Sequence, residues 1–166
     1  MGNIKKDNKE EKHYTPEVLI DEMFRLLHRN HFEPITSYLE TSAGDGRICD
    51  KFDRPYTAFD IKNETLRSDI IEADYLKTHL PYQQGRVCIQ NPPFNKGLKF
   101  VYKALEECDY VVSMLSYNSI MNIDYKKYWV EEIQLYRKLQ FDKCKQSVVL
   151  IAIRKKREGE LYDYEF

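Results

Sequence analysis

The sequence predicts an α/β fold in which a mostly parallel sheet carries helices on both faces. Short apolar segments alternate along the chain with helical or turn segments, the pattern of parallel strands joined by crossover connections. The inner apolar segments are nearly continuous, as expected for strands buried on both faces. With 166 residues, 42% of them apolar, the chain is long enough for one core and too short for two.

Two kinds of element follow one another from residue 15 onward. A first helix is expected to begin with Thr15 as N-cap and Pro16 at its first position, and to run to about Asn30, because apolar residues recur there at helical spacing. Further helices are expected at 97–107 and 118–130, and a single turn between Gly44 and Tyr56. The expected strands are 37–41, 56–61, 69–75, 86–90, 110–115, 132–141 and 147–154.

The two ends of the chain differ from this pattern. Residues 1–12 are charged and aperiodic, and are expected to form a disordered arm, while 158–166 form an acidic and aromatic tail. Residues 13–157 then make one domain. No apolar run approaches the ~20 residues of a membrane span, and the N-terminus lacks the apolar core of a secretory signal. We therefore expect no membrane association.

The cysteines and the charges suggest a compartment and a class of partner. The four cysteines are irregularly spaced, without a C-x-x-C pair or a His-Cys cluster, which favours reduced thiols in a cytosolic protein and no metal site. The composition is rich in Lys, Asn, Ile and Tyr, which fits a low-GC genome and suggests a bacterial or phage-encoded protein. Residues 1–95 carry 13 basic and 16 acidic side chains, whereas 96–157 carry 13 and 7. The basic half is a candidate polyanion surface, although an ordinary solvated face explains the charge equally well. The candidate phosphate contacts are Lys96, Lys99, Arg154, Lys155, Lys156 and Arg157.

Candidate ligand-binding residues stand where predicted strands end. Ligands of open α/β sheets bind beyond the carboxyl ends of the strands. Gly44 and Gly46 follow the first strand and allow a tight turn that a ligand can approach closely, although such a pair is more often only a turn. Asp60 ends the second strand, where a carboxylate can accept both hydroxyls of a ribose or can simply cap a helix.

The segment Asn91-Pro92-Pro93-Phe94 is the most specific motif. Two prolines cannot continue a sheet ladder, so they end the strand and stiffen the backbone. The Asn91 side-chain amide and the Pro92 carbonyl then become fixed acceptors, and Phe94 offers a flat apolar face. Two acceptors beside a stacking ring can hold the exocyclic amine of a base and stabilise the positive charge that develops when that amine attacks a methyl group.

These motifs, in this order, resemble the amino-group, S-adenosylmethionine-dependent adenine methyltransferases of the gamma-ordered group, whose cofactor motifs precede an Asn-Pro-Pro-aromatic loop. The resemblance covers about residues 13–155 and rests on Thr15-Pro16, the loop from Leu39 to Gly46, Asp60, Asp74-Tyr75-Leu76 and Asn91–Phe94. It implies a Rossmann-like class I methyltransferase sheet, mostly parallel with an antiparallel last strand, a role that suits 147–154.

The resemblance also implies roles for individual residues. Asn91, Pro92, Pro93 and Phe94 would form the catalytic loop around the target base. Asp60 would bind the ribose hydroxyls of S-adenosylmethionine, with Ile61 against its adenine, and Asp74 and Tyr75 would hold that adenine. The residues implied to enclose the rest of the cofactor are Tyr14, Thr15, Pro16, Glu40, Ala43, Gly44 and Gly46, with Asn91 at the methyl group.

Three functional hypotheses follow. The first is methylation of adenine N6 in DNA, favoured by the glycine loop and the Thr-Pro helix start. The second is the same reaction on structured RNA, because the chain has no segment left for a separate recognition domain, and a partner protein would then supply target recognition. The third is an inactive partner subunit, which the intact Asn91–Phe94 loop argues against. Protein and small-molecule amines complete the alternatives, with Phe94 disfavouring the glutamine-modifying branch.

Overall fold

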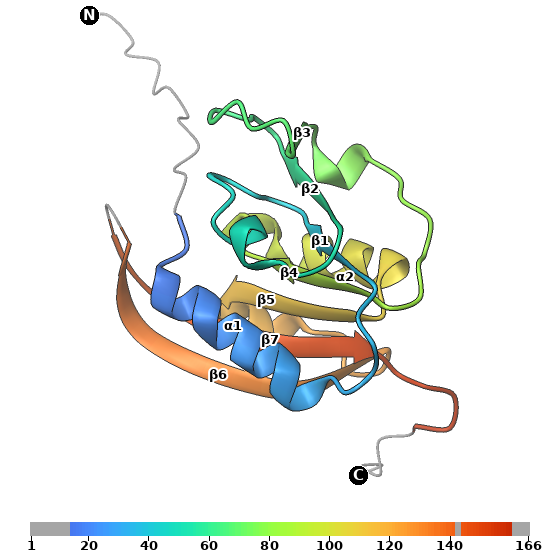
Figure 1. Cartoon of the computed structure of the whole chain (residues 1–166). Coiled ribbons are helices and arrows are strands. Elements are labelled where there is room, and N and C mark those ends of the chain that lie inside the picture. The colour runs from blue at the N-terminus through green and yellow to red at the C-terminus, as the bar shows by residue number, and fades with distance from the viewer. Residues whose placement is uncertain (1–13, 142–143, 161–166) are drawn as a thin grey trace, which may run out of the picture.

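The computed structural model describes residues 14–141 and 144–160, which form a sheet in the order β3-β2-β1-β4-β5-β7-β6 (Figure 1). The predicted arm at 1–12 and the last six residues of the predicted tail lie outside this range. No helix of the described part is long and apolar enough to cross a bilayer. The strands are β1 (Ser37–Glu40), β2 (Tyr56–Asp60), β3 (Ile71–Glu72), β4 (Arg86–Gln90), β5 (Tyr110–Ser116), β6 (Tyr128–Phe141) and β7 (Cys144–Lys155).

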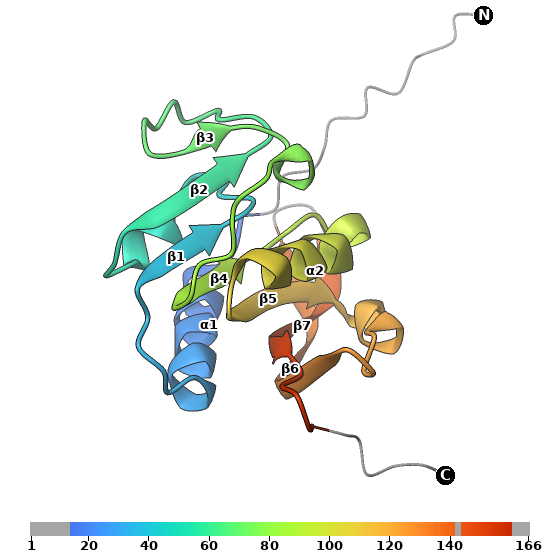
Figure 2. The same ribbon diagram turned by 90° about the vertical axis from the view of Figure 1, so that its right-hand side faces the viewer.

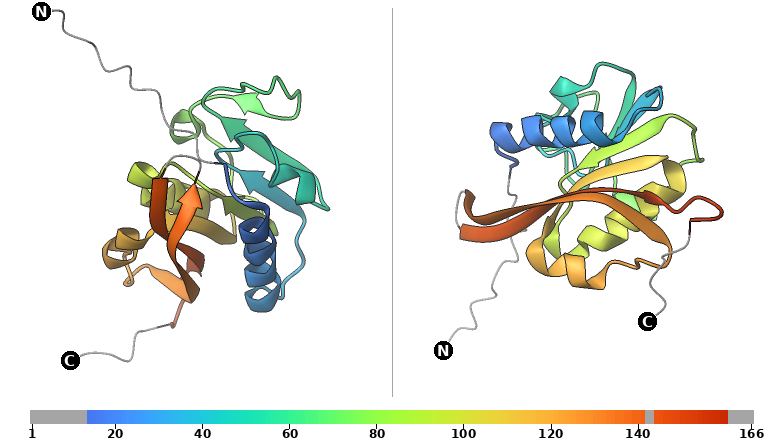
Figure 3. Two further views of the ribbon diagram at one scale, coloured as in Figure 1. Left: turned by 90° about the vertical axis from the view of Figure 1, so that its left-hand side faces the viewer. Right: turned by 90° about the horizontal axis from the view of Figure 1, so that it is seen from below.

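The strand directions agree with the predicted fold. The strands from β3 to β5 pair in parallel, and β7 lies antiparallel between β5 and β6. The expected antiparallel strand at 147–154 is therefore confirmed as the centre of β7, with Ile151 opposite Ser113 of β5. Figure 3 shows β6 and β7 as a long curved pair at one side of the sheet.

The two longest helices cover opposite faces of the sheet (Figure 2). Helix α1 (Glu17–Asn30) packs on one set of alternating strand residues, among them Val87 and Val112. Helix α2 (Gly97–Glu107) packs on the other set, among them Cys88 and Val111. Because successive strand side chains point to opposite faces, these two clusters lie on the two sides of one sheet.

Some expected elements differ in the structure. The helix predicted at 118–130 is wrong: a short 3-10 helix, η4 (Tyr117–Asn122), is followed by the start of β6. The Asp124 side chain accepts the N–H of Lys126 in a turn, and Tyr128 and Trp129 then pair with β7. Aromatic residues favour such a ladder over a helix. The predicted single turn after Gly44 is confirmed as η1 (Cys49–Lys51).

Candidate active site

The candidate site lies where the strand order reverses, between the carboxyl ends of β1 and β4. From this point β2 and β3 continue on one side and β5 on the other, the arrangement that opens a crevice in an α/β sheet. The loops that leave the two strands bond to each other. The Ser42 hydroxyl donates to the Asn91 carbonyl over 2.9 Å, and the Thr41 hydroxyl donates to the buried side chain of Gln90. The glycine loop and the Asn-Pro-Pro-Phe loop therefore form one site.

A pocket of about 420 Å³ occupies this position, within the range of ligand sites, about 300–1,000 Å³. Eleven of the predicted site residues line it, together with four that the sequence analysis did not select. The lining residues are Tyr14, Thr41, Ser42, Gly44, Asp60, Ile61, Asp74, Tyr75, Asn91, Pro92, Pro93, Phe94, Asn95, Lys96 and Phe100.

The Asp60 carboxylate is fixed by backbone donors on both oxygens. The N–H of Gly44 donates to Oδ2 over 2.8 Å, and the N–H of Lys62 donates to Oδ1 over 3.0 Å. Gly44 adopts a φ of +58°, a left-handed conformation that glycine adopts without a Cβ penalty. Since a carboxylate has about four acceptor positions, the buried Asp60 can still accept hydroxyl groups of a ligand.

Gly46 and Ala43 do not line the pocket. A Cβ on Gly46, whose φ is +84°, would lie 2.3 Å from Nη1 of Arg67. Arg67 donates from this nitrogen to the Asp45 carbonyl over 3.3 Å. Ala43 packs in a small buried cluster with Ile70. Both residues therefore shape the loop from behind.

Glu40 also acts from beneath the loop. Its side chain is fully buried, and one oxygen accepts the N–H of Ser42 over 2.9 Å, while the other has no hydrogen-bond partner among the described residues. Burial raises the pKa of Glu40 to about 8. Glu40 is therefore not among the residues that line the pocket, and its role toward the cofactor stays a prediction.

Asp74 and Tyr75 form the far wall of the pocket. Asp74 caps the 3-10 helix η2 (Tyr75–Lys77) by accepting the N–H of Leu76 over 3.1 Å. The buried Tyr75 donates its hydroxyl to Glu107 of α2 over 2.6 Å, and the Lys103 ammonium lies 4.1 Å from the centre of its ring. Because the hydroxyl is taken, Tyr75 presents only its ring and backbone to a ligand.

The Asn91 loop connects β4 to α2. Pro92 is buried, Asn91 and Phe94 are half-buried, and the 3-10 helix η3 (Phe94–Lys96) leads directly into α2. Gly97, which the sequence analysis did not select, allows this close passage: a Cβ there would lie 2.6 Å from Cδ2 of Leu115 on β5. The loop is thus held between the sheet and α2.

The segment Tyr14–Pro16 lies beside the site, but Thr15 is not the N-cap of α1. Pro16 occupies that position without a side-chain bond. The Thr15 hydroxyl instead accepts from Nδ2 of Asn91 over 2.9 Å. Tyr14 lines the pocket, with its ring against Gly44. Neither Thr15 nor Pro16 lines the pocket itself.

Four pocket residues were missed. Thr41 and Ser42 lie within the recognised loop, and only their bonds to β4 show that they face the site. Asn95 adjoins Phe94. Phe100 is one turn further along α2, and its ring centre lies 5.6 Å from that of Tyr75. A lone phenylalanine at helical spacing gives no sequence signal beyond an ordinary core position.

The candidate phosphate contacts do not gather on one surface. Lys96 lines the pocket and Lys99 is exposed on the first turn of α2. Residues 154–157 lie at the other end of the strands from the pocket, where the parallel strands begin, because β7 runs antiparallel and its carboxyl end lies there. A second cavity of about 480 Å³ lies at this end of the sheet.

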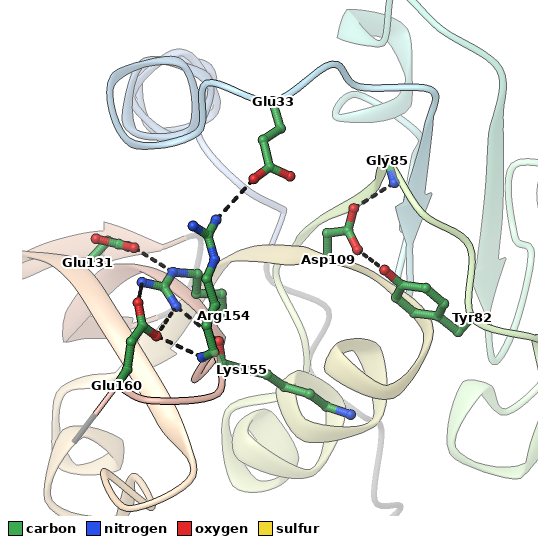
Figure 4. A network of polar contacts seen from close by, with 9 residues as sticks. Glu33, Tyr82, Gly85, Asp109, Glu131, Arg154, Lys155 and Glu160 are labelled. Carbon is green, nitrogen blue, oxygen red and sulfur yellow. Dashed lines mark hydrogen bonds and ion pairs between the residues drawn. The ribbon is translucent and has the colours of Figure 1, made fainter. Parts of the chain in front are cut away.

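Acidic side chains engage much of this distant basic segment (Figure 4). Arg154 donates to Glu131 over 2.7 Å and to both oxygens of Glu160, an acid of the tail, over 2.7 and 2.8 Å. Lys155 pairs with Glu106 over 2.7 Å, and Arg157 with Glu33 over 3.0 Å. These pairs reduce the attraction of this end of the sheet for a polyanion.

Metal-ligating side chains do not cluster in the described ranges. Residues 14–141 and 144–160 contain no group of three or more His, Cys, Asp or Glu side chains placed to hold an ion. Cys49, Cys88 and Cys108 are buried and free, and burial raises the pKa of each thiol. Their thiols are therefore inert core groups in this fold.

Comparison with known proteins identifies the fold. No protein-family model and no curated protein sequence matches the chain. Among solved structures, the chain is similar to a candidate RNA methyltransferase from Pyrococcus horikoshii, with 14% identity, a TM-score of 0.69, and 87% of this chain and 88% of that chain covered. It is also similar to the 23S rRNA methyltransferase ErmE, with 16% identity, a TM-score of 0.66, and 91% and 72% covered.

A third similar structure is the methyltransferase subunit of a type I restriction-modification system from Streptococcus thermophilus. It shares 11% identity with a TM-score of 0.64, over 88% of this chain and 45% of that chain. Identities this low show a common fold and nothing finer. The chain has the class I methyltransferase fold, a Rossmann-like sheet with one antiparallel strand in its interior.

Proposed function

We propose that this protein transfers a methyl group from S-adenosylmethionine to the N6 amino group of adenine in a nucleic acid. One observation carries the proposal. A single pocket joins Asp60, at the end of β2, to Asn91, Pro92 and Phe94, at the end of β4. One cavity thus offers a carboxylate that can accept hydroxyl groups of one ligand and two oxygens that can accept the amine of another.

The residues present fit the cofactor. Asp60 would accept the ribose hydroxyls, as its fixed and buried carboxylate is suited to do. Ile61, half exposed beside it, would pack against the adenine ring, with Asp74 accepting from the adenine amine. Gly44 would let the methionine part approach the backbone, with Tyr14 above it. When bound, the cofactor supplies an electrophilic methyl group.

The catalytic step belongs to the Asn91 loop. The adenine amine would donate to the side-chain oxygen of Asn91 and to the Pro92 carbonyl, with the base stacked on Phe94. When the amine nitrogen takes the methyl group that the bound cofactor would supply, positive charge would develop on the amine. The two oxygens stabilise that charge in a partly dehydrated pocket, and the amine proton is then lost to solvent.

DNA is the first candidate polymer, supported by the sequence of the glycine loop and the Thr-Pro helix start. Lys96 and Lys99, beside the pocket, would contact phosphates near the target base. Structured RNA is the second candidate. The candidate RNA methyltransferase and ErmE align over 88% and 72% of their own lengths, whereas the restriction-modification subunit aligns over 45%. An RNA substrate would favour a partner protein for target recognition.

The deciding experiment offers the purified protein labelled S-adenosylmethionine with unmethylated DNA and structured RNA in parallel, followed by nucleoside analysis. We expect N6-methyladenine in one polymer. Asn91→Ala should lower turnover by a factor on the order of 10², the scale for one preorganised polar group, with cofactor affinity nearly unchanged. Gln84→Ala, which removes an exposed amide at the opposite end of the sheet, is the matched control.

Each other outcome has a defined meaning. Wild-type turnover in Asn91→Ala would make the loop structural and refute the proposed chemistry. A methylated base other than adenine would refute the substrate assignment. Cofactor binding without methylation of either polymer would favour the inactive partner subunit, and co-purification with an active methyltransferase would then test that function.

A further inference from the structure

We propose that Thr15 is a positioning residue that holds the amide of Asn91 in its reactive orientation. The inference rests on the proposed function of Asn91. A threonine before a proline at the start of a helix would normally accept a backbone N–H of the first turn. Here α1 has no side-chain cap, and the Thr15 hydroxyl bonds to Asn91 across 76 residues of chain.

The direction of this bond matters for the chemistry. An asparagine amide has a donor end and an acceptor end, and only the oxygen can stabilise a positively charged amine. Nδ2 of Asn91 donates to Oγ1 of Thr15 over 2.9 Å. The nitrogen end is thereby turned to the N-terminal segment. An inverted amide would present donors to the substrate amine, which is itself a donor.

The position of Thr15 is fixed from the glycine loop. Nη1 of Arg47 donates to the Thr15 carbonyl over 3.1 Å, and the guanidinium group lies 5.3 Å from the centre of the Tyr14 ring. Nε of Arg47 in turn donates to both oxygens of Asp45 over 2.9 and 3.0 Å. Thr15 is itself 95% buried, with an exposed fraction of 5%. The hydroxyl is therefore a stationary acceptor.

This arrangement links the two halves of the site. Tyr14 packs on Gly44, Arg47 ties the same segment to the loop after β1, and Thr15 reaches the loop after β4. The segment Tyr14–Thr15 thus contacts both the loop after β1 and the Asn91 amide, so the position of that amide depends on the position of the loop. Thr15 lies outside the pocket lining, so it acts through Asn91 and not by touching a ligand.

The test compares Thr15→Val, which keeps the shape but removes the acceptor, with Thr15→Ser, which keeps the hydroxyl. Loss of one hydrogen bond predicts a kcat about tenfold lower in Thr15→Val, with KM and cofactor affinity within about twofold of wild type. Thr15→Ser should retain most of the turnover. Thermal melting of both variants confirms that they fold.

A double-mutant cycle separates positioning from a structural effect. If Thr15 acts through Asn91, adding Thr15→Val to Asn91→Ala should cause no further loss of kcat. The same loss in both backgrounds would overturn the inference, as would a wild-type kcat in Thr15→Val.

A spectroscopic readout makes failure of the inference distinct from failure of the proposed function. The side-chain NH₂ signals of Asn91 are assigned by their absence in Asn91→Ala. We expect them to be protected from solvent exchange in wild type and in Thr15→Ser, and unprotected in Thr15→Val. Equal protection in Thr15→Val would refute the positioning bond whether or not any substrate is methylated.

Discussion

Replacement of Asp60 is the sharpest test of the cofactor half of the pocket. Asp60→Ala removes the acceptor of two backbone N–H groups, at 2.8 Å from Gly44 and 3.0 Å from Lys62, and the proposed acceptor of the ribose hydroxyls. A hydrogen bond to a charged group contributes about 1.5–3 kcal/mol. The affinity for S-adenosylmethionine should therefore fall by about 10-fold to 150-fold.

Asp60→Ala should lower the free energy of unfolding by less than it weakens the binding of the cofactor. Lys62 is an exposed residue, so we expect its N–H to bond to water in the variant. Gly44 is half-buried, so its N–H is expected to lose its partner without such compensation. We expect a loss of about 1–2 kcal/mol in the free energy of unfolding. Asp60→Asn keeps one oxygen for Gly44 and should recover most of that stability while still losing affinity.

Titration calorimetry with S-adenosylmethionine, together with thermal melting, measures both quantities. Asp74→Ala provides an internal comparison, because its carboxylate already accepts the Leu76 N–H and would meet a neutral amine, so its affinity loss should be smaller. An affinity within twofold of wild type in both Asp60 variants would refute the reasoning and leave Asp60 as a support for the glycine loop alone.

Three other predictions address the base, the polymer and the buried acid. Phe94→Ala should raise KM and lower kcat, whereas Phe94→Tyr keeps the stacking ring and should retain most activity in the same steady-state assay. Lys96→Ala and Lys99→Ala should each reduce the salt slope of duplex DNA binding by about 0.9, with Lys155→Ala unchanged, as measured by anisotropy titrations. The pKa of Glu40 is raised from 4.5 to about 8, so between these pH values the native state keeps the carboxyl proton that the unfolded chain loses. The free energy of unfolding, relative to that of Glu40→Gln, should therefore fall as the pH rises from 4.5 to 8. Denaturation at several pH values measures it.

The sequence by itself determined the fold class and predicted two parts of the candidate site. Periodicity located α2 as 97–107, and the apolar run near 147–154 identified β7, because continuous burial on two faces leaves a continuous apolar signal. The Asn91–Phe94 loop and Asp60 are predicted as site residues because they stand at the ends of strands that are marked by local chemistry, and in the structure they line one pocket. These features depend on neighbours in the chain.

Only the tertiary structure decided which side chains reach the pocket. Thr15 is predicted as a helix cap but bonds to Asn91, and Glu40 and Gly46, which are predicted as cofactor contacts, lie outside the pocket lining. The basic run that ends in Arg157 falls at the far end of the strands because β7 runs antiparallel. Each of these outcomes depends on a contact between distant segments, and such contacts leave no periodic or local pattern from which sequence reasoning could predict them.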